Sequence, residues 1–106
     1  MSELLIHIAE QFSDAPGGRC REDGPYSGEE FRDEFLTPAM NNTSISKIII
    51  NFDESYGYAT SFLEEAFGGL ARIFGVNEVL NKLVFISNEE PNLIEEVNKY
   101  IKTSVE

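Results

Sequence analysis

Ser61 is the residue of this chain whose position most clearly suggests chemistry. It follows the apolar segment 47–53 and opens the segment 61–74, in which apolar residues recur at helical spacing. A serine at a helix start can bond a free backbone N–H, and Glu64 three residues later completes the spacing of a capping box. The same position suits phosphorylation, because backbone N–H groups and the helix dipole stabilise a phosphate there. The sequence leaves both roles open.

A second candidate site lies in the segment 15–24, where two successive glycines precede two arginines. Glycine N–H groups beside guanidinium groups can bind a phosphate or a carboxylate. The strand-then-helix pattern and the lysine of a P-loop are both missing from this segment. Glu22 and Asp23 could instead pair with the arginines, which would leave an ordinary surface turn. The predicted anion-binding residues are Gly17, Gly18, Arg19 and Arg21.

Side chains with a pattern typical of catalysis are few. His7 is the only histidine and Cys20 is the only cysteine, and Cys20 has no histidine near it in the sequence. No spacing of Asp or Glu indicates a metal site or an acid–base pair. We therefore expect no enzymatic activity, no metal and no cofactor.

The charge balance limits the possible partners. Nineteen Asp and Glu against eight Lys and Arg give a formal charge of −11, which disfavours binding to nucleic acid and to anionic membrane surfaces. The single cysteine fits a reducing compartment. The N-terminal segment has an acidic residue, Glu3, and no apolar run long enough for a signal peptide or a membrane span. We expect a cytoplasmic protein.

The hydrophobic pattern predicts the elements that must position these residues. The 106 residues are enough for one domain, 1–106. Strands alternate with helices, which predicts an α/β domain with a mostly parallel or mixed β-sheet and helices packed on it. We predict three strands, at 4–12, 47–53 and 83–87, and expect the strand 47–53 to lie in the centre of the sheet with both faces covered. We predict helices from Ser27 to about Pro38, at 61–74 and at 91–106, and a short helical turn at 77–83.

Two features of the helices stand out. Ser27 and Glu30 have the spacing of a capping box, which places a helix start there. Gly68 and Gly69 lie inside the predicted helix 61–74, although each costs about 0.5 to 1 kcal/mol relative to alanine. The glycine pair therefore indicates close packing, either against the sheet or a neighbouring helix, or against the backbone of a partner.

Four stretches of the chain together resemble a known family. They are APGGR, SGEEFR, IIINFD and GYATSFLEEAFGGLAR, and the chain resembles over nearly its whole length the STAS-like family of uncharacterised bacterial proteins. Relatives of that family include the anti-sigma-factor antagonists. The resemblance implies a small STAS-like domain with a mixed β-sheet, in which a strand leads through a short loop into a helix whose start is the functional surface.

In the antagonists that helix start reads Asp-Ser-Ser-Gly-Leu, and an ATP-binding kinase that is also an anti-sigma factor phosphorylates the second serine. The segment 59–63 occupies this motif, so that Ser61 takes the place of the phosphorylated serine with Thr60 beside it. Ala59 lacks the carboxylate of the motif, and Phe62 is bulky where the antagonists have glycine.

The resemblance thus implies a non-catalytic regulatory module that binds a protein, possible partners being ATP-binding, kinase-like regulators. Phosphorylation would release the partner rather than recruit it, because Glu64 and Glu65 add to the repulsion. The alternative is a domain that senses a small anionic ligand or nucleotide through the segment 15–24. The predicted partner-binding residues are Tyr56, Gly57, Tyr58, Phe62 and Glu65.

Overall fold

A three-stranded β-sheet forms one layer of the protein. In the computed structural model, which describes residues 2–104, the strands are β1 (Ser2–His7), β2 (Ile45–Asn51) and β3 (Leu83–Ile86). Their order is β1-β2-β3, so β2 lies at the centre of the sheet as predicted. Both strand pairs are parallel, and Ile50 of β2 is in register with Ile6 and Phe85. The described sheet is therefore parallel throughout and not mixed.

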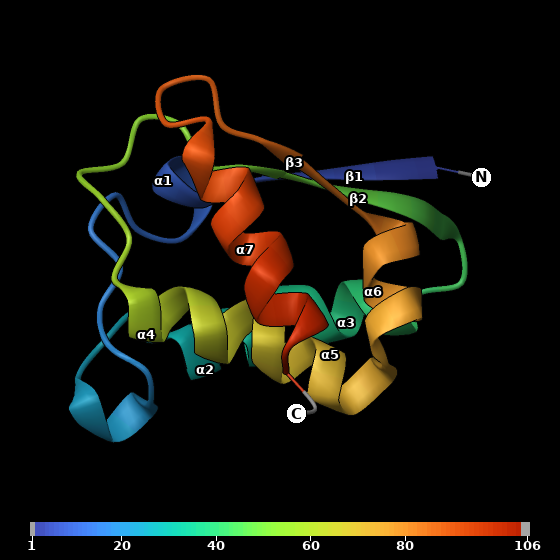
Figure 1. The fold of residues 1–106 in the computed structure, drawn as a ribbon, viewed down its shortest axis with the longest axis horizontal. Coiled ribbons are helices and arrows are strands. Elements are labelled where there is room, and N and C mark those ends of the chain that lie inside the picture. The colour runs from blue at the N-terminus through green and yellow to red at the C-terminus, as the bar shows by residue number, and fades with distance from the viewer. Residues whose placement is uncertain (1, 105–106) are drawn as a thin grey trace.

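Helices connect β1 to β2 and β2 to β3, and a further helix follows β3. These helices lie mainly on one side of the sheet (Figure 1). Two helices of the chain each contain a wider, π-helical segment in the middle: η2 lies between α2 and α3, and η3 lies between α4 and α5. The elements are α1 (Ile8–Gln11), the 3₁₀ turn η1 (Arg21–Asp23), α2 (Gly28–Phe31), η2 (Arg32–Leu36), α3 (Thr37–Asn41), α4 (Thr60–Leu63), η3 (Glu64–Gly68), α5 (Gly69–Phe74), α6 (Val76–Lys82) and α7 (Asn92–Lys102).

The first strand and the first long helix end at other residues than predicted. β1 stops at His7, because the next residues turn into α1 and the N–H groups of Phe12 and Ser13 both bond the carbonyl of Ile8. The helix that Ser27 caps, through a 3.1 Å bond from the Glu30 N–H, continues through Pro38 to Asn41. The π-helical turn η2 directly precedes α3, and a wider turn lets a helix accommodate a proline.

The C-terminal helix is shorter than the predicted 91–106. α7 spans Asn92–Lys102, and Leu93, Val97 and Ile101 face inward as their spacing indicates. The last two residues of the predicted helix lie outside the described residues.

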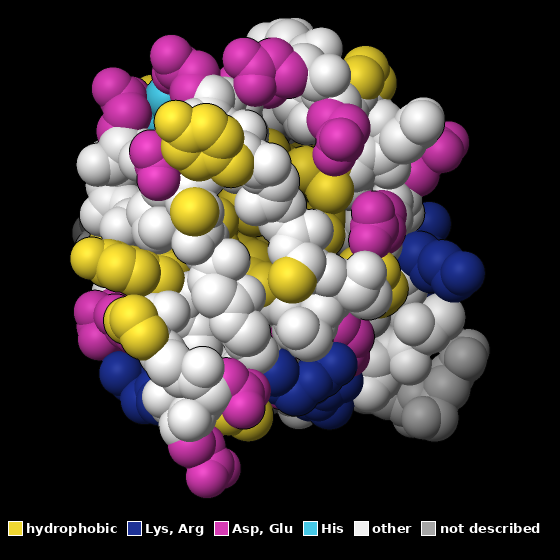
Figure 2. Space-filling model, turned by 90° about the vertical axis from the view of Figure 1, so that its left-hand side faces the viewer, with side chains coloured by type: hydrophobic (Ala, Val, Ile, Leu, Met, Phe, Trp, Pro, Cys, Tyr) yellow, Lys and Arg dark blue, Asp and Glu magenta, His cyan; other side chains and the backbone are white. Residues whose placement is uncertain are grey.

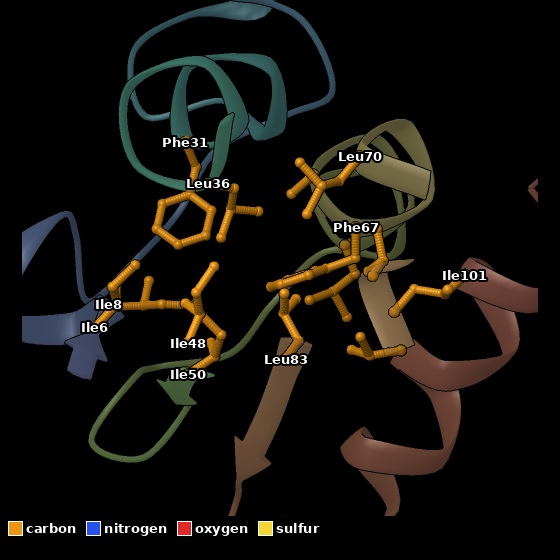
Figure 3. Packing of buried hydrophobic residues seen from close by; sticks show 14 of the residues in the cluster. Ile6, Ile8, Phe31, Leu36, Ile48, Ile50, Phe67, Leu70, Leu83 and Ile101 are labelled. Carbon is orange, nitrogen blue, oxygen red and sulfur yellow. The ribbon is translucent and has the colours of Figure 1, made fainter. Parts of the chain in front are cut away.

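The core lies between the sheet and the helices (Figure 3). Ile48 and Ile50 of β2 have no exposed surface, and they face buried side chains of the helices such as Phe67. The other face of the sheet is less covered: Leu5 and Val84, which flank Ile49 in register, are 54% and 42% exposed. The prediction that the central strand is covered on both faces is therefore wrong.

The glycine pair at the η3–α5 junction packs closely, which supports the structural interpretation. A Cβ atom on Gly68 would lie 2.6 Å from Oε2 of Glu64 and 3.3 Å from the Tyr100 carbonyl of α7. On Gly69 it would lie 2.5 Å from Nη1 of Arg32. The absence of a side chain thus lets α7 and the Arg32 guanidinium approach the helix.

Among residues 2–104, no helix combines the length and the apolar character that crossing a bilayer requires.

Candidate functional site

The loop between β2 and α4, residues 52–59, leaves the carboxyl end of the central strand. Ligands and partners of parallel sheets often bind at this edge. The Tyr58 hydroxyl donates to the Phe52 carbonyl at 2.8 Å, and the two rings lie edge to face with centroids 5.3 Å apart. Burial, helped by the nearby Asp53 and Glu89, raises the pKa of Tyr58 to about 12. Tyr58 is thus a neutral anchor of the loop.

The tip of this loop presents Tyr56 to solvent. Its side chain is 88% exposed, while its N–H donates to the Asp14 carbonyl at 2.8 Å. The Ser55 hydroxyl accepts a bond from the Gly57 N–H at 2.9 Å, and Gly57 has φ = 140°, a conformation that favours glycine. The backbone around the exposed ring is therefore fixed by bonds on both sides.

Phe62, predicted to contact a partner, belongs to the core instead. It has no exposed surface, and its ring lies near those of Phe31 and Tyr58, with centroids 5.9 and 6.1 Å away. The resemblance implies a place for Phe62 on the functional surface through its position in the motif, but the helix turns this side chain into the hydrophobic core. Of the five predicted partner-binding residues, Tyr56 and Gly57 are exposed, and Tyr58 is half-buried.

The helix begins one residue before Ser61, so the predicted capping box at Ser61 is wrong. Ala59 is the N-cap residue, and its carbonyl accepts from the Leu63 N–H at 3.2 Å. No side chain caps this helix start, and the Glu64 carboxylate bonds arginines instead. Ser61 is half-buried in the first turn, and Thr60 before it is exposed.

A group of three arginines and two glutamates, which we call the arginine cluster, follows this helix start. Glu64 pairs with Arg19 at 2.5 Å and with Arg72 at 2.7 Å. Glu65 pairs with Arg32 at 2.5 Å and with Arg19 at 3.3 Å. Arg32 also pairs with Asp33 at 3.3 Å, so each arginine of the cluster has at least one carboxylate partner within the chain.

Glu65, predicted to bind a partner, is thus held inside the chain by two arginines. Its side chain is 19% exposed, and Nη1 of Arg32 donates to the Glu65 carbonyl as well, at 3.1 Å. These pairs could not be predicted from local sequence patterns, because Arg19 and Arg32 lie 46 and 33 residues from Glu65.

Both arginines of the segment 15–24 are also paired, although not with Glu22 or Asp23. Arg19 belongs to the arginine cluster, and the exposed Arg21 contacts Asp33 and Glu34 at 3.6 and 3.4 Å. Hydrogen bonds between backbone atoms fasten the segment to the start of α2: the Gly17 N–H donates to the Tyr26 carbonyl, and the Gly18 and Arg19 carbonyls accept from the Gly28 and Glu29 N–H groups.

A pH titration tests the arginine cluster. The bond from Arg72 lowers the pKa of Glu64, and Arg19 adds to this shift, which burial opposes. The folded pKa lies below the ordinary value of 4.5, so the pairing stabilises the fold above pH 4.5 and is lost as the pH falls through the folded pKa. We expect urea unfolding to show that Glu64→Gln lowers stability at pH 7 and that its difference from wild type shrinks below pH 4.5. A difference that does not change with pH would contradict the pairing.

A small pocket of about 120 Å³ lies between the loop 52–59 and the segment that follows β3. Its lining includes Tyr56, Gly57 and Tyr58 together with the acidic residues Glu89 and Glu90. Ligand pockets usually enclose about 300 Å³ or more, so this one is small for a metabolite. Two wider grooves, of about 340 and 380 Å³, lie beside β1 and on α7, and no predicted site residue lines either.

Comparison with known families decides what these elements belong to. The family model for the STAS-like domain of unknown function (DUF4325) matches residues 27–93. The chain belongs to this family. The match runs from the cap of α2 to the start of α7. It contains Ser61 and the loop 52–59, which we call the Tyr56 loop. It also contains every member of the arginine cluster except Arg19. Comparison with curated proteins and with solved structures gave no match. The segment 15–24 precedes the matched part of this STAS-like domain.

Proposed function

We propose that this STAS-like domain is a non-catalytic regulatory module that binds a protein partner through Tyr56 and Gly57 and the start of α4. The exposure of Tyr56 carries the proposal: an aromatic ring that is 88% exposed stands on a loop fixed by hydrogen bonds. Tyrosine is frequent among the residues that contribute most to protein interfaces, and a fixed loop loses little entropy on binding.

The proposed switch is phosphorylation of Ser61, with the exposed Thr60 as its neighbour. Glu64 and Glu65 follow Ser61 by three and four residues, the spacing at which side chains share a helix face. Arginines bind both carboxylates, so their repulsion of a phosphate is reduced, and Arg19 is 41% exposed. A phosphate adds about −1.5 to −2 charges and would compete for Arg19, changing the surface beside Tyr56 and releasing the partner.

The nature of the partner follows from the resemblance alone. Antagonists of this kind are phosphorylated by an ATP-binding kinase, and we propose a kinase-like regulator of the cytoplasm as the partner here. The acidic surface supports a protein over nucleic acid or a membrane, because both of these attract cationic proteins.

The alternative, a sensor of small anions or nucleotides, has less support from the geometry. An anion at Arg19 or Arg21 would have to displace carboxylates of the same chain, at 2.5 Å from Arg19 and 3.4 Å from Arg21. Binding of inorganic phosphate or ATP that is lost in Arg21→Gln would favour this alternative.

Affinity capture from the native cell tests the proposed surface with four forms of the protein. We expect wild type to retain a partner that Tyr56→Ser and Ser61→Asp lose. The matched control is Ile73→Ser, because Ile73 on α5 is also an exposed apolar residue, at 57%. The control should retain the partner. Equal capture by all four forms would contradict the proposed surface.

A further inference from the structure

His7, at the end of β1, faces oxygen acceptors on both ring nitrogens. Its Nδ1 contacts the carboxylate of Glu10, and its Nε2 lies 3.0 Å from the Asp53 carbonyl and 3.2 Å from Oε1 of Glu54. The side chain of His7 is 13% exposed, whereas those of Glu10 and Glu54 are 70% and 66% exposed. Figure 2 shows the only histidine, in cyan, among acidic side chains in magenta.

Oxygens on both sides of the ring require a cation. A neutral imidazole carries one N–H, and ionised carboxylates and carbonyls only accept. If Nδ1–H donates to Glu10, the lone pair of Nε2 points at two oxygens, which repel it unless a proton or a metal ion lies between.

The spacing of these atoms suits a metal ion as well as a proton. Metal–ligand bonds of about 2.0 to 2.2 Å, at angles of about 90° to 110°, place neighbouring ligand atoms about 2.8 to 3.6 Å apart. The two oxygens lie 3.0 and 3.2 Å from Nε2, within this range. A carboxylate on the other ring nitrogen, where Glu10 lies, orients a metal-bound histidine in many proteins and makes it more basic.

We propose that Nε2 of His7, the Glu54 carboxylate and the Asp53 carbonyl bind a divalent transition metal ion of the Zn²⁺ class, with Glu10 as the positioning residue on Nδ1. The side chains of His7, Glu10 and Glu54 each offer a ligand atom, and these three atoms lie within 4.8 Å of one another. The imidazole nitrogen favours Zn²⁺, Cu²⁺ or Ni²⁺ over Mg²⁺ and Ca²⁺, which prefer oxygen alone. Water completes the coordination, because both glutamates face solvent.

The metal ion would join β1 to the loop that carries Tyr56, since Asp53 and Glu54 belong to that loop. The site is independent of the proposed function: its residues hold the ion whether or not the loop binds a protein.

Calorimetric titration with Zn²⁺ tests the site on the full chain. We expect one ion per chain, with affinity reduced at least about tenfold in His7→Gln, in Glu54→Gln and, through positioning, in Glu10→Gln. Glu54→Gln keeps the test valid if His7→Gln fails to fold, because the Glu54 side chain is mostly exposed. Glu22→Gln removes an exposed carboxylate elsewhere and Cys20→Ser removes the only thiol, so neither control should change the affinity.

The nitrogen chemical shifts of the His7 ring report the binding mode directly. We expect Zn²⁺ to leave Nδ1 protonated and to shift Nε2 to the value of a metal-bound nitrogen. Absence of Zn²⁺ binding, or equal affinity in Glu54→Gln and Glu22→Gln, would overturn the proposal and leave His7 as a site for a proton alone.

Discussion

Gly28→Ala is expected to destabilise the protein by about 2 kcal/mol, within the range for an overpacked contact. Gly28 begins α2 at its crossing with α4, where an added Cβ would lie 2.5 Å from the Phe62 carbonyl and 3.1 Å from Cβ of Glu65. The nearest obstacle is backbone and cannot rotate away. The two helices must therefore separate, and the core around Phe62 loosens. Urea unfolding followed by circular dichroism measures the loss.

Gly69→Ala is the matched control for this prediction. Its Cβ would lie 2.5 Å from Nη1 of Arg32, a side-chain atom and not backbone, so the clash displaces one guanidinium group without forcing the two helices apart. An alanine inside a helix is also favoured over glycine by about 0.8 to 1 kcal/mol. We expect Gly69→Ala to change stability less than Gly28→Ala does. An equal loss in the two variants, or a stable Gly28→Ala protein, would contradict the close helix crossing.

Glu65→Gln is expected to cost about 2 kcal/mol as well, because it removes the closer and less exposed of the two carboxylates that pair with a mostly buried arginine; the other, Asp33, is 42% exposed. The side chains of Arg32 and Glu65 are only 12% and 19% exposed, and they hold η2 against η3. Arg32 is also fixed by the Glu65 carbonyl, so it does not escape to water when the charge of its partner is removed. Urea unfolding at pH 7 measures this difference too.

Glu34→Gln makes the same chemical change at an exposed ion pair. Glu34 and its partner Arg21 are 52% and 46% exposed, and pairs of this kind contribute about 0 to 1 kcal/mol. We expect the control to lie near wild type. If Glu34→Gln and Glu65→Gln destabilise equally, burial of the arginine cluster does not strengthen its pairs, and our account of the cluster is wrong.

Features that depend on neighbouring residues could be predicted from the sequence. The bond from the Glu30 N–H to Ser27 follows from their spacing, and the inward face of α7 follows from its 3.6-residue period. The central position of β2 follows from its nearly continuous apolar run. The residues around Ser61 also indicate the family whose model matches the segment 27–93.

Features that depend on distant parts of the chain could not be predicted. The helix begins at Thr60 and not, as predicted, at Ser61. Glu64 therefore does not cap the helix and pairs with Arg19 and Arg72 instead. The fold brings Asp53 and Glu54 to His7 although 46 residues separate His7 from Asp53, and the spacing of Asp and Glu along the sequence could not indicate this group. Contacts between such segments arise from the packing of the sheet and helices, which no local pattern records.

The Tyr56 loop and the two glutamates of the arginine cluster lie in one continuous segment of the chain, from the end of β2 to η3, and the three arginines reach this segment from other parts of the chain. The loop is fixed by Tyr58, whose hydroxyl binds the Phe52 carbonyl, and the helix after it is fixed by the arginines. A phosphate on Ser61 would therefore act between two rigid parts, and its effect on a partner would come from charge and contact rather than from unfolding of the loop.

Photo-crosslinking from position 56 in the native cell tests the central claim most directly. Because the Tyr56 side chain is 88% exposed, a photoreactive phenylalanine analogue can replace it without disturbing the core, and the same analogue at the exposed position 73 is the control. Our account predicts a discrete covalent adduct with one protein from position 56 and none with that protein from position 73. No adduct from position 56, or the same adducts from both positions, would contradict it.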